Sequence, residues 1–169
     1  MAMRKPNSKS IKLTGPVLYA NVKNANGRIY TTDCILKIMD QAQEYIHRGS
    51  LLGELDQPNR PEVSLGQVSH RVTEVYYNFE KNALEATIEV LETPKGQILK
   101  SQIESCGNVK NFMENMGCIA SRGTGTINEK GEVENYTLYS FDVVAKNKDA
   151  YRDITFAPIS SRDPLDDLK

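Results

Sequence analysis

Apolar and polar residues alternate along several stretches of the chain, which is the pattern of β-strands that bury one face. The strands predicted in this way are 11–21, 51–55, 67–79, 83–91, 116–126 and 133–145. Short polar links at 80–82 and 128–131 join the last four of them into two hairpins. In the first strand Gly15 and Pro16 interrupt the pattern, which indicates a sheet edge or a β-bulge.

Helical spacing of apolar residues occurs in two further stretches. The first, 32–48, follows threonines that can cap its start and is followed by Gly49, a residue typical of helix ends. The second, 93–105, has Pro94 in its first turn and Gly107 after its end. Strands and helices do not alternate as they do in parallel sheets. The predicted fold class is therefore α+β, an antiparallel β-barrel-like sheet of about six strands with two main flanking helices.

The two ends of the chain differ from its middle. Residues 1–10 are polar and basic, and residues 158–169 are polar, acidic and contain proline. We predict a flexible N-terminal arm and a C-terminal tail, because neither segment offers apolar side chains to a core. Between them, 11–157 is predicted to form a single domain, since no linker divides it.

Composition excludes several classes of function. The chain has 169 residues, with 21 Lys and Arg against 22 Asp and Glu, so it lacks the positive charge that binding of nucleic acid requires. Its three cysteines follow no metal-binding spacing, which favours free thiols in a reducing compartment over disulfides or zinc. No apolar run approaches the roughly 20 residues of a membrane span. We expect a cytosolic protein with no metal, no cofactor and no membrane contact.

The stretch 116–126 combines an apolar start, a Ser-Arg pair and several glycines. Glycine lets the backbone of a strand approach another group closely. Two interpretations follow from this pattern. The strand can hold a nucleophile beside an oxyanion hole, or it can lie at a crowded barrel closure.

Six segments in order resemble the T4-type prohead core protein protease family of tailed phages, serine endopeptidases that cut scaffold and shell proteins. The segments are 24–30 (Asn-Ala-Asn-Gly-Arg-Ile-Tyr), 52–58 (Leu-Gly-Glu-Leu-Asp-Gln-Pro), 68–70 (Val-Ser-His), 91–96 (Leu-Glu-Thr-Pro-Lys-Gly), 120–125 (Ala-Ser-Arg-Gly-Thr-Gly) and 141–144 (Phe-Asp-Val-Val). Together they span residues from about 20 to 145. The resemblance implies a β-barrel with flanking helices, similar to herpesvirus assemblin and, more distantly, to phage tail-tube proteins.

The chain departs from this family at the two positions that the resemblance makes catalytic. The family loop has a histidine, the general base, where this chain has Gln57. The family strand has the nucleophilic serine where this chain has Ala120. A glutamine amide does not take up a hydroxyl proton and a methyl group does not attack a carbonyl. Loss of one member of such a pair typically costs on the order of 10⁶ in turnover.

Neighbouring residues offer one alternative. If the register is shifted by one, Ser121 is the nucleophile and His70 the base, with Asp142 to orient it. Against this, Ser121 points to the opposite face of an extended strand from Ala120, and the alternation around His70 favours a buried, hydrogen-bonded histidine. Arg122 is expected either to preserve an oxyanion pocket or, as the simpler interpretation, to pair with Asp142 or Glu54.

We therefore expect a catalytically inactive protein of this fold that acts as a structural or assembly component of the virion. Its expected partners are capsid, core or tail proteins of the phage and further copies of itself, and its expected location is the host cytoplasm during assembly. The alternative is an active serine endopeptidase that uses Ser121, His70 and Asp142.

Overall fold

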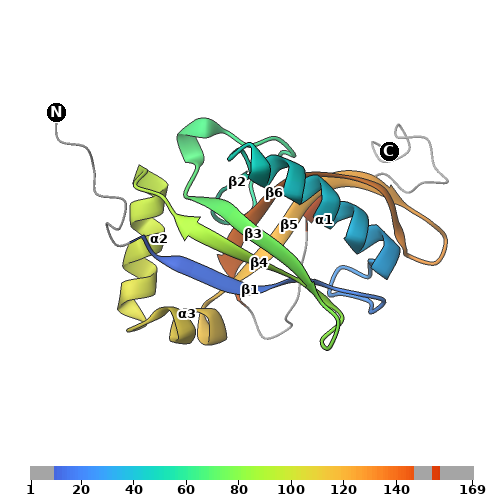
Figure 1. Cartoon of the computed structure of the whole chain (residues 1–169), viewed down its shortest axis with the longest axis horizontal. Helices are drawn as coiled ribbons and strands as arrows, with labels where there is room; N and C mark the ends of the chain where they lie inside the picture. Colours follow the sequence, from blue (N-terminus) through green and yellow to red (C-terminus); the bar gives the residue numbers. More distant parts are fainter. Residues whose placement is uncertain (1–9, 147–153, 157–169) are drawn as a thin grey trace.

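The structure is a computed structural model that describes residues 10–146 and 154–156 (Figure 1). Its strands form two sheets. The four-stranded sheet has the order β1-β4-β3-β2, with β1 Lys12–Tyr19, β4 Ala83–Val90, β3 His70–Asn78 and β2 Leu52–Gly53. The three-stranded sheet has the order β6-β5-β7, with β6 Val133–Ala145, β5 Gly117–Ile127 and β7 Ile154–Phe156. Strand pairs are antiparallel except for β5 and β7.

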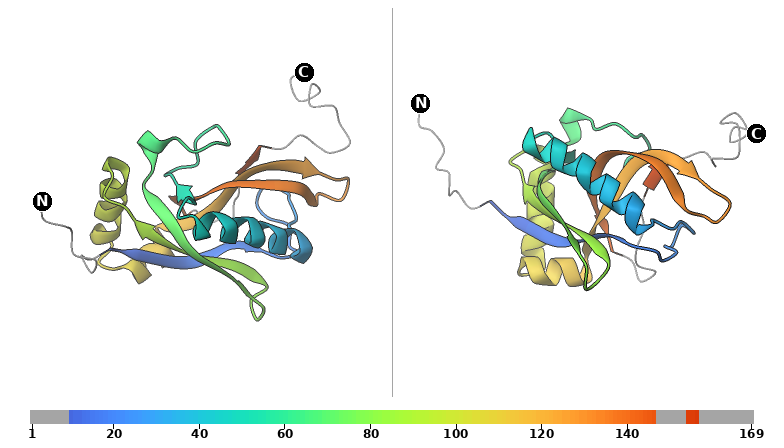
Figure 2. Two further views of the ribbon diagram at one scale, coloured as in Figure 1. Left: turned by 45° about the horizontal axis from the view of Figure 1, so that its top comes forward. Right: turned by 45° about the vertical axis from the view of Figure 1, so that its right-hand side comes forward.

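The helices are α1 Thr32–His47, α2 Pro94–Ser105, α3 Val109–Asn115 and the short 3-10 helix η1 Leu65–Gln67. Threonine side chains cap α1 and α2, because the Thr31 hydroxyl accepts from the Cys34 amide at 3.1 Å and the Thr93 hydroxyl from the Gly96 amide at 2.9 Å. In all views α2 and α3 lie together at one end of the molecule, and the turn between β5 and β6 projects at the opposite end (Figure 2).

Helix α1 joins the two sheets. Its buried face, which includes Ile35, Ile38 and Ala42, contacts β3 of one sheet and β6 of the other. The Gln41 amide completes the contact: Nε2 donates to the Tyr136 carbonyl at 2.8 Å, and Oε1 accepts from the Leu138 amide at 2.9 Å. The apolar periodicity of 32–48 is thereby explained by packing on two surfaces at once.

A second junction connects the end of β2 with β6. The Val143 amide donates to the Glu54 carbonyl at 3.0 Å, and the Asp56 amide donates to the Val143 carbonyl at 2.9 Å. These bonds extend the curved wall of the barrel from β6 across to β2. They also place the chain after β2 beside the β5–β6 hairpin, where the family motifs meet.

The predicted α+β class, the two hairpins and the two main helices are confirmed. Strand β1 is an edge strand with a register shift between Pro16 and Leu18, as the Gly15-Pro16 interruption indicated. The segments predicted as arm and tail lie outside the described residues, except for Ser10. The division into arm, domain and tail stays a prediction.

Two details of the structure differ from what the sequence patterns indicate. The first is the face of Val75: strict alternation along 67–79 would place it opposite His70 and Val72, but it is buried as they are. A register shift in β3 between Val72 and Glu74 adds one residue to this strand, so the side chains after it point to the opposite face from the one that strict alternation gives. The second is the polar connection after α2, for which the sequence indicated no helix: it contains α3, which Asn108 caps and which buries Phe112.

Two glycines of β5, Gly117 and Gly123, lie so close to neighbouring groups that a side chain would not fit. A Cβ atom on Gly123 would lie 2.4 Å from the Thr137 carbonyl oxygen and 2.5 Å from the Tyr136 ring. A Cβ on Gly117 would lie 2.4 Å from the Phe112 ring. Of the two interpretations of the glycine-rich strand, crowding at the barrel closure accounts for these two residues.

Candidate active site

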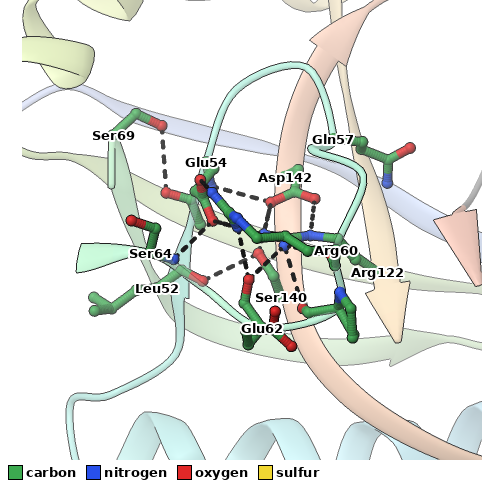
Figure 3. A network of polar contacts seen from close by, with 12 residues as sticks. Leu52, Glu54, Gln57, Arg60, Glu62, Ser64, Ser69, Arg122, Ser140 and Asp142 are labelled. Carbon is green, nitrogen blue, oxygen red and sulfur yellow. Dashed lines mark hydrogen bonds and ion pairs between the residues drawn. The ribbon is translucent and has the colours of Figure 1, made fainter. Parts of the chain in front are cut away.

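Loop 54–64 follows β2 and covers the β5–β6 hairpin (Figure 3). It contains Gln57, the residue in place of the family's histidine, and it ends close to where it begins, because the Ser64 amide donates to Glu54 Oε2 at 3.1 Å. Asp56 and Gln57 have φ values of 62° and 45°, in the left-handed region that non-glycine residues rarely adopt. The loop therefore holds a specific conformation rather than a relaxed one.

Arg122 on β5 is the centre of a buried polar network. Its side chain is completely buried, and its Nε donates to Asp142 Oδ2 at 2.8 Å. Its Nη2 donates to Asp142 Oδ1 and to Glu54 Oε2, both at 3.1 Å. Its Nη1 lies at 2.9 Å, 3.2 Å and 3.0 Å from the carbonyl oxygens of Arg60, Pro61 and Glu62. Every N–H group of the guanidinium has an acceptor.

Glu54, Arg60 and Asp142 complete the network. Arg60 makes a two-pronged contact with Glu54, at 2.8 Å and 2.7 Å. Asp142 also accepts from the Ser140 hydroxyl at 2.7 Å and from the Glu54 amide at 3.1 Å. Two guanidinium groups thus balance two carboxylates in a site from which water is largely excluded, as buried charges require.

The network also sets the ionisation of Glu54. Burial alone would raise the pKa of this carboxyl, but hydrogen bonds from Arg60, Ser64 and Arg122 outweigh burial and hold the pKa below its usual value. Glu54 is therefore ionised in the folded protein at neutral pH. The expected pairing of Arg122 with Asp142 or Glu54 is confirmed, and Arg122 pairs with both.

The two positions that the resemblance makes catalytic lie in the same part of the structure. Gln57 Nε2 donates to the carbonyl oxygen of Ser121, the residue that follows Ala120 in β5, at 2.9 Å. Ala120 lies opposite Asp142 in the β5–β6 ladder, so both side chains point to the same face of the hairpin. The Ala120 side chain is completely buried. At this place the chain presents an amide and an enclosed methyl group.

Ser121 lies on the other face of β5. Its ladder partner is Phe141, and its side chain is completely buried. The Ser121 hydroxyl has no hydrogen-bond partner among the described residues. The alternative catalytic pair is therefore not hydrogen-bonded in this structure.

We expect Ser121→Ala to stabilise the fold by about 1 kcal/mol, because it removes a buried hydroxyl that makes no hydrogen bond. Urea unfolding followed by circular dichroism measures this change. The matched control is Ser140→Ala, which removes a hydroxyl bonded to Asp142 and is expected to destabilise. Destabilisation by Ser121→Ala as well would show that its hydroxyl has a partner in solution.

His70 on β3 has both ring nitrogens engaged. Nε2 donates to the Phe141 carbonyl at 2.6 Å, and Nδ1 accepts from the Ser69 hydroxyl at 2.7 Å. The ring is completely buried. Burial lowers the pKa of His70, although the Phe141 carbonyl and the nearby charges of Asp142 and Glu54 act in the opposite direction. His70 is accordingly a neutral residue that joins β3 to β6.

The burial of His70 should make the free energy of unfolding depend on pH. Its pKa in the folded state lies below the ordinary value of about 6.5, so the unfolded chain binds its proton first as the pH falls. Stability is then complete above about pH 6.5 and is lost below it, by up to about 1.4 kcal/mol per pH unit. Urea unfolding between pH 7 and pH 5 should show this slope. His70→Gln should abolish it, whereas His47→Gln, at the exposed end of α1, should keep it.

A groove borders loop 54–64 on the side of α2. One part, about 250 Å³, is lined mainly by apolar side chains, among them Leu55, Ile98 and Met116. The adjoining part, about 280 Å³, is lined by the loop and by Lys95, and it shares Leu55, Asp56 and Ile98 with the first. Ile98 and Met116 are exposed by 47% and 40%, which is high for large apolar side chains.

Residues 10–146 and 154–156 contain no group of three or more His, Cys, Asp or Glu side chains able to hold a metal ion. Cys34, Cys106 and Cys118 are free thiols. No helix in the described ranges is both long enough and apolar enough to cross a membrane.

Among the residues of the polar network that the sequence did not indicate are Arg60, Ser64 and Ser140. Of these, Arg60 gives a usable signal, because a lone arginine between Pro58 and Pro61 follows a glutamate in a short loop. Ser64 contributes a backbone amide, and Ser140 lies in an ordinary alternating strand. Neither position is distinguishable in the sequence from a solvent-facing serine.

Comparisons with known proteins agree with the fold described above. A model of the family described as prohead core protein serine protease matches residues 5–151. Among solved structures, the chain is similar to the capsid assembly protease gp21 of bacteriophage T4, at 26% sequence identity and a TM-score of 0.65, over 79% of this chain and 80% of that chain. A search of curated proteins finds no match. Since the family model covers most of the sequence, the resemblance of the six segments is confirmed, and the chain belongs to the prohead core protein serine protease family.

Proposed function

We propose that this family member is catalytically inactive and acts as a structural or assembly component of a phage particle. The observation that carries the proposal is the pair Gln57 and Ala120. The Gln57 side chain donates to the carbonyl oxygen of Ser121, the residue directly after Ala120, so the two positions that the resemblance makes catalytic belong to the same part of the structure. Neither side chain can accept a hydroxyl proton or attack a carbonyl group.

The surrounding residues offer no substitute. Ser121 is enclosed on the opposite face of β5 from Ala120 and is not hydrogen-bonded to His70. His70 Nε2 donates to the Phe141 carbonyl, and His70 Nδ1 accepts from the Ser69 hydroxyl. Asp142 accepts two hydrogen bonds from Arg122 instead of orienting an imidazole. These contacts support structural roles for His70 and Asp142, and the Ser121 hydroxyl is bonded to no base.

What remains is a surface suited to protein contacts. The groove beside loop 54–64 exposes Ile98 and Met116, and apolar side chains at the surface of a groove favour binding of a partner chain. The relative in bacteriophage T4 is a capsid assembly protease. We infer that the partners of this chain are capsid, core or tail proteins and further copies of the chain, met in the host cytoplasm during assembly.

Genetic complementation tests the proposal. A phage that lacks this gene should be defective in assembly, and the defect should be rescued equally by the natural chain and by Ser121→Ala. The scaffold and capsid proteins of the same phage should also keep their full mass after incubation with the purified chain. Failure of Ser121→Ala to rescue, together with cleavage that depends on Ser121, would establish the alternative, an active peptidase.

A further inference from the structure

The guanidinium of Arg122 is bonded to loop 54–64 at both of its ends. Nη2 reaches Glu54 Oε2, at the start of the loop, and Nη1 reaches three consecutive carbonyl groups of residues 60–62, near its end. The same planar group is fixed to β6 through its two hydrogen bonds with Asp142. One side chain thus connects both arms of the loop with both strands of the hairpin (Figure 3).

The other contacts of loop 54–64 that follow each connect fewer parts of the structure than Arg122 does. Arg60 bonds Glu54 and the Glu62 carbonyl, so it closes the loop on itself. The backbone bonds with Val143 hold only residues 54–56. Gln57 contributes a single neutral amide bond to β5. Charge-assisted bonds from a buried arginine are stronger and geometrically more specific than such a neutral bond.

We infer that Arg122 is the positioning residue of this site, and that its guanidinium, rather than the contact of Gln57 itself, fixes residue 57 at the part of β5 that follows residue 120. The inference rests on the proposed function, in which these two residues mark the former catalytic pair. It also excludes Arg122 as a donor to a bound oxyanion, because all of its N–H groups are engaged within the protein.

The substitution Arg122→Lys tests this role while keeping the charge. A lysine ammonium balances the buried carboxylates, but its three donors cannot reach Asp142, Glu54 and residues 60–62 together. In nuclear magnetic resonance spectra, the side-chain amide signal of Gln57 should move to the position of a solvent-exposed glutamine. Hydrogen exchange at the Ser64 amide should become about tenfold faster or more, since one or two hydrogen bonds of the loop are lost. Exchange at Ile88 in β4 should become faster by a clearly smaller factor than at Ser64.

Two control variants separate this role from others. Arg60→Met removes a guanidinium of the same type from the loop but leaves the contacts of Arg122 in place, so the Gln57 signal should stay. Gln57→Ala removes the neutral bond to β5, and exchange at Ser64 should stay slow because Arg122 still holds the loop.

The outcomes are distinct. An unchanged Gln57 signal in folded Arg122→Lys would overturn the inference, and so would equally faster exchange in the loop and at Ile88, which would indicate a contribution to global stability only. If Arg122→Lys does not fold, Glu54→Gln serves instead, because it keeps the shape of the side chain and weakens one arm of the contact. The Gln57 signal is then the readout and should move in the same way, since the Ser64 amide bonds Glu54 directly. None of these readouts depends on catalysis, so a failure here is distinguishable from a failure of the proposed function.

Discussion

Replacing Arg122 by methionine should lower the free energy of unfolding by about 3–5 kcal/mol, the typical cost of removing one partner from a buried ion network. Methionine fills a similar volume but leaves Asp142 without its charged partner and Glu54 with Arg60 alone. The carbonyl groups of residues 60–62 would also lose their common donor. Urea unfolding monitored by circular dichroism measures the change.

Lys37→Met is the matched control for this loss. Lys37 pairs with Asp33 on α1, but the two side chains are 74% and 80% exposed. Exposed pairs of this kind contribute little to stability, so the control should leave the unfolding curve in place. If Arg122→Met behaved like the control, the buried network would not be a determinant of the fold.

Gly53→Ala should be the second severe substitution, with a cost of about 3 kcal/mol. A Cβ atom on Gly53 would lie 2.0 Å from His70 Nε2 and 2.2 Å from the Phe141 carbonyl oxygen. It would therefore collide with both members of the hydrogen bond that joins β3 to β6. For a domain of this size the melting temperature should fall by roughly 6–12 °C.

Gly66→Ala provides the control for the alanine methyl group itself. A Cβ on Gly66, in η1, would meet no atom within 4 Å. The melting temperature of Gly66→Ala should stay close to that of the natural chain. A Gly53→Ala protein that also melted normally would mean that β2 and His70 can move apart, and that their contact does not fix the start of loop 54–64.

Local signals in the sequence explain why the elements were predictable. Helix α1 has a capping threonine, an apolar face and Gly49 in the left-handed region at its end, with φ of 70°. The two hairpins follow from alternation and polar turns, and Gly131 has the positive φ, 84°, that such a turn uses. Each of these features depends on residues close together in the chain.

Features that depend on distant residues were not predictable in the same way. Helix α3 has seven residues with few apolar ones, and it is stabilised by burying Phe112 against β5. The register shift in β3 has no signal, since 67–79 alternates without a glycine or proline between Val68 and Phe79.

The candidate site also has features that the sequence indicated and features that it did not. The positions of Gln57 and Ala120 came from the family resemblance, and the pairing of Arg122 with a carboxylate was foreseen from its charge. Its contacts with residues 60–62 join groups about 60 positions apart, through backbone carbonyls that any residue carries. No sequence pattern specifies such contacts, so the role of Arg122 became visible only in three dimensions.

The central claim is that this member of a protease family has no nucleophile. Incubation of the purified natural chain with a serine-directed fluorophosphonate, followed by intact-mass spectrometry, tests it directly, with an active serine hydrolase in the same tube as positive control. We expect that the mass of the chain does not change while the control hydrolase is fully labelled. A covalent adduct on Ser121, absent from Ser121→Ala, would contradict it.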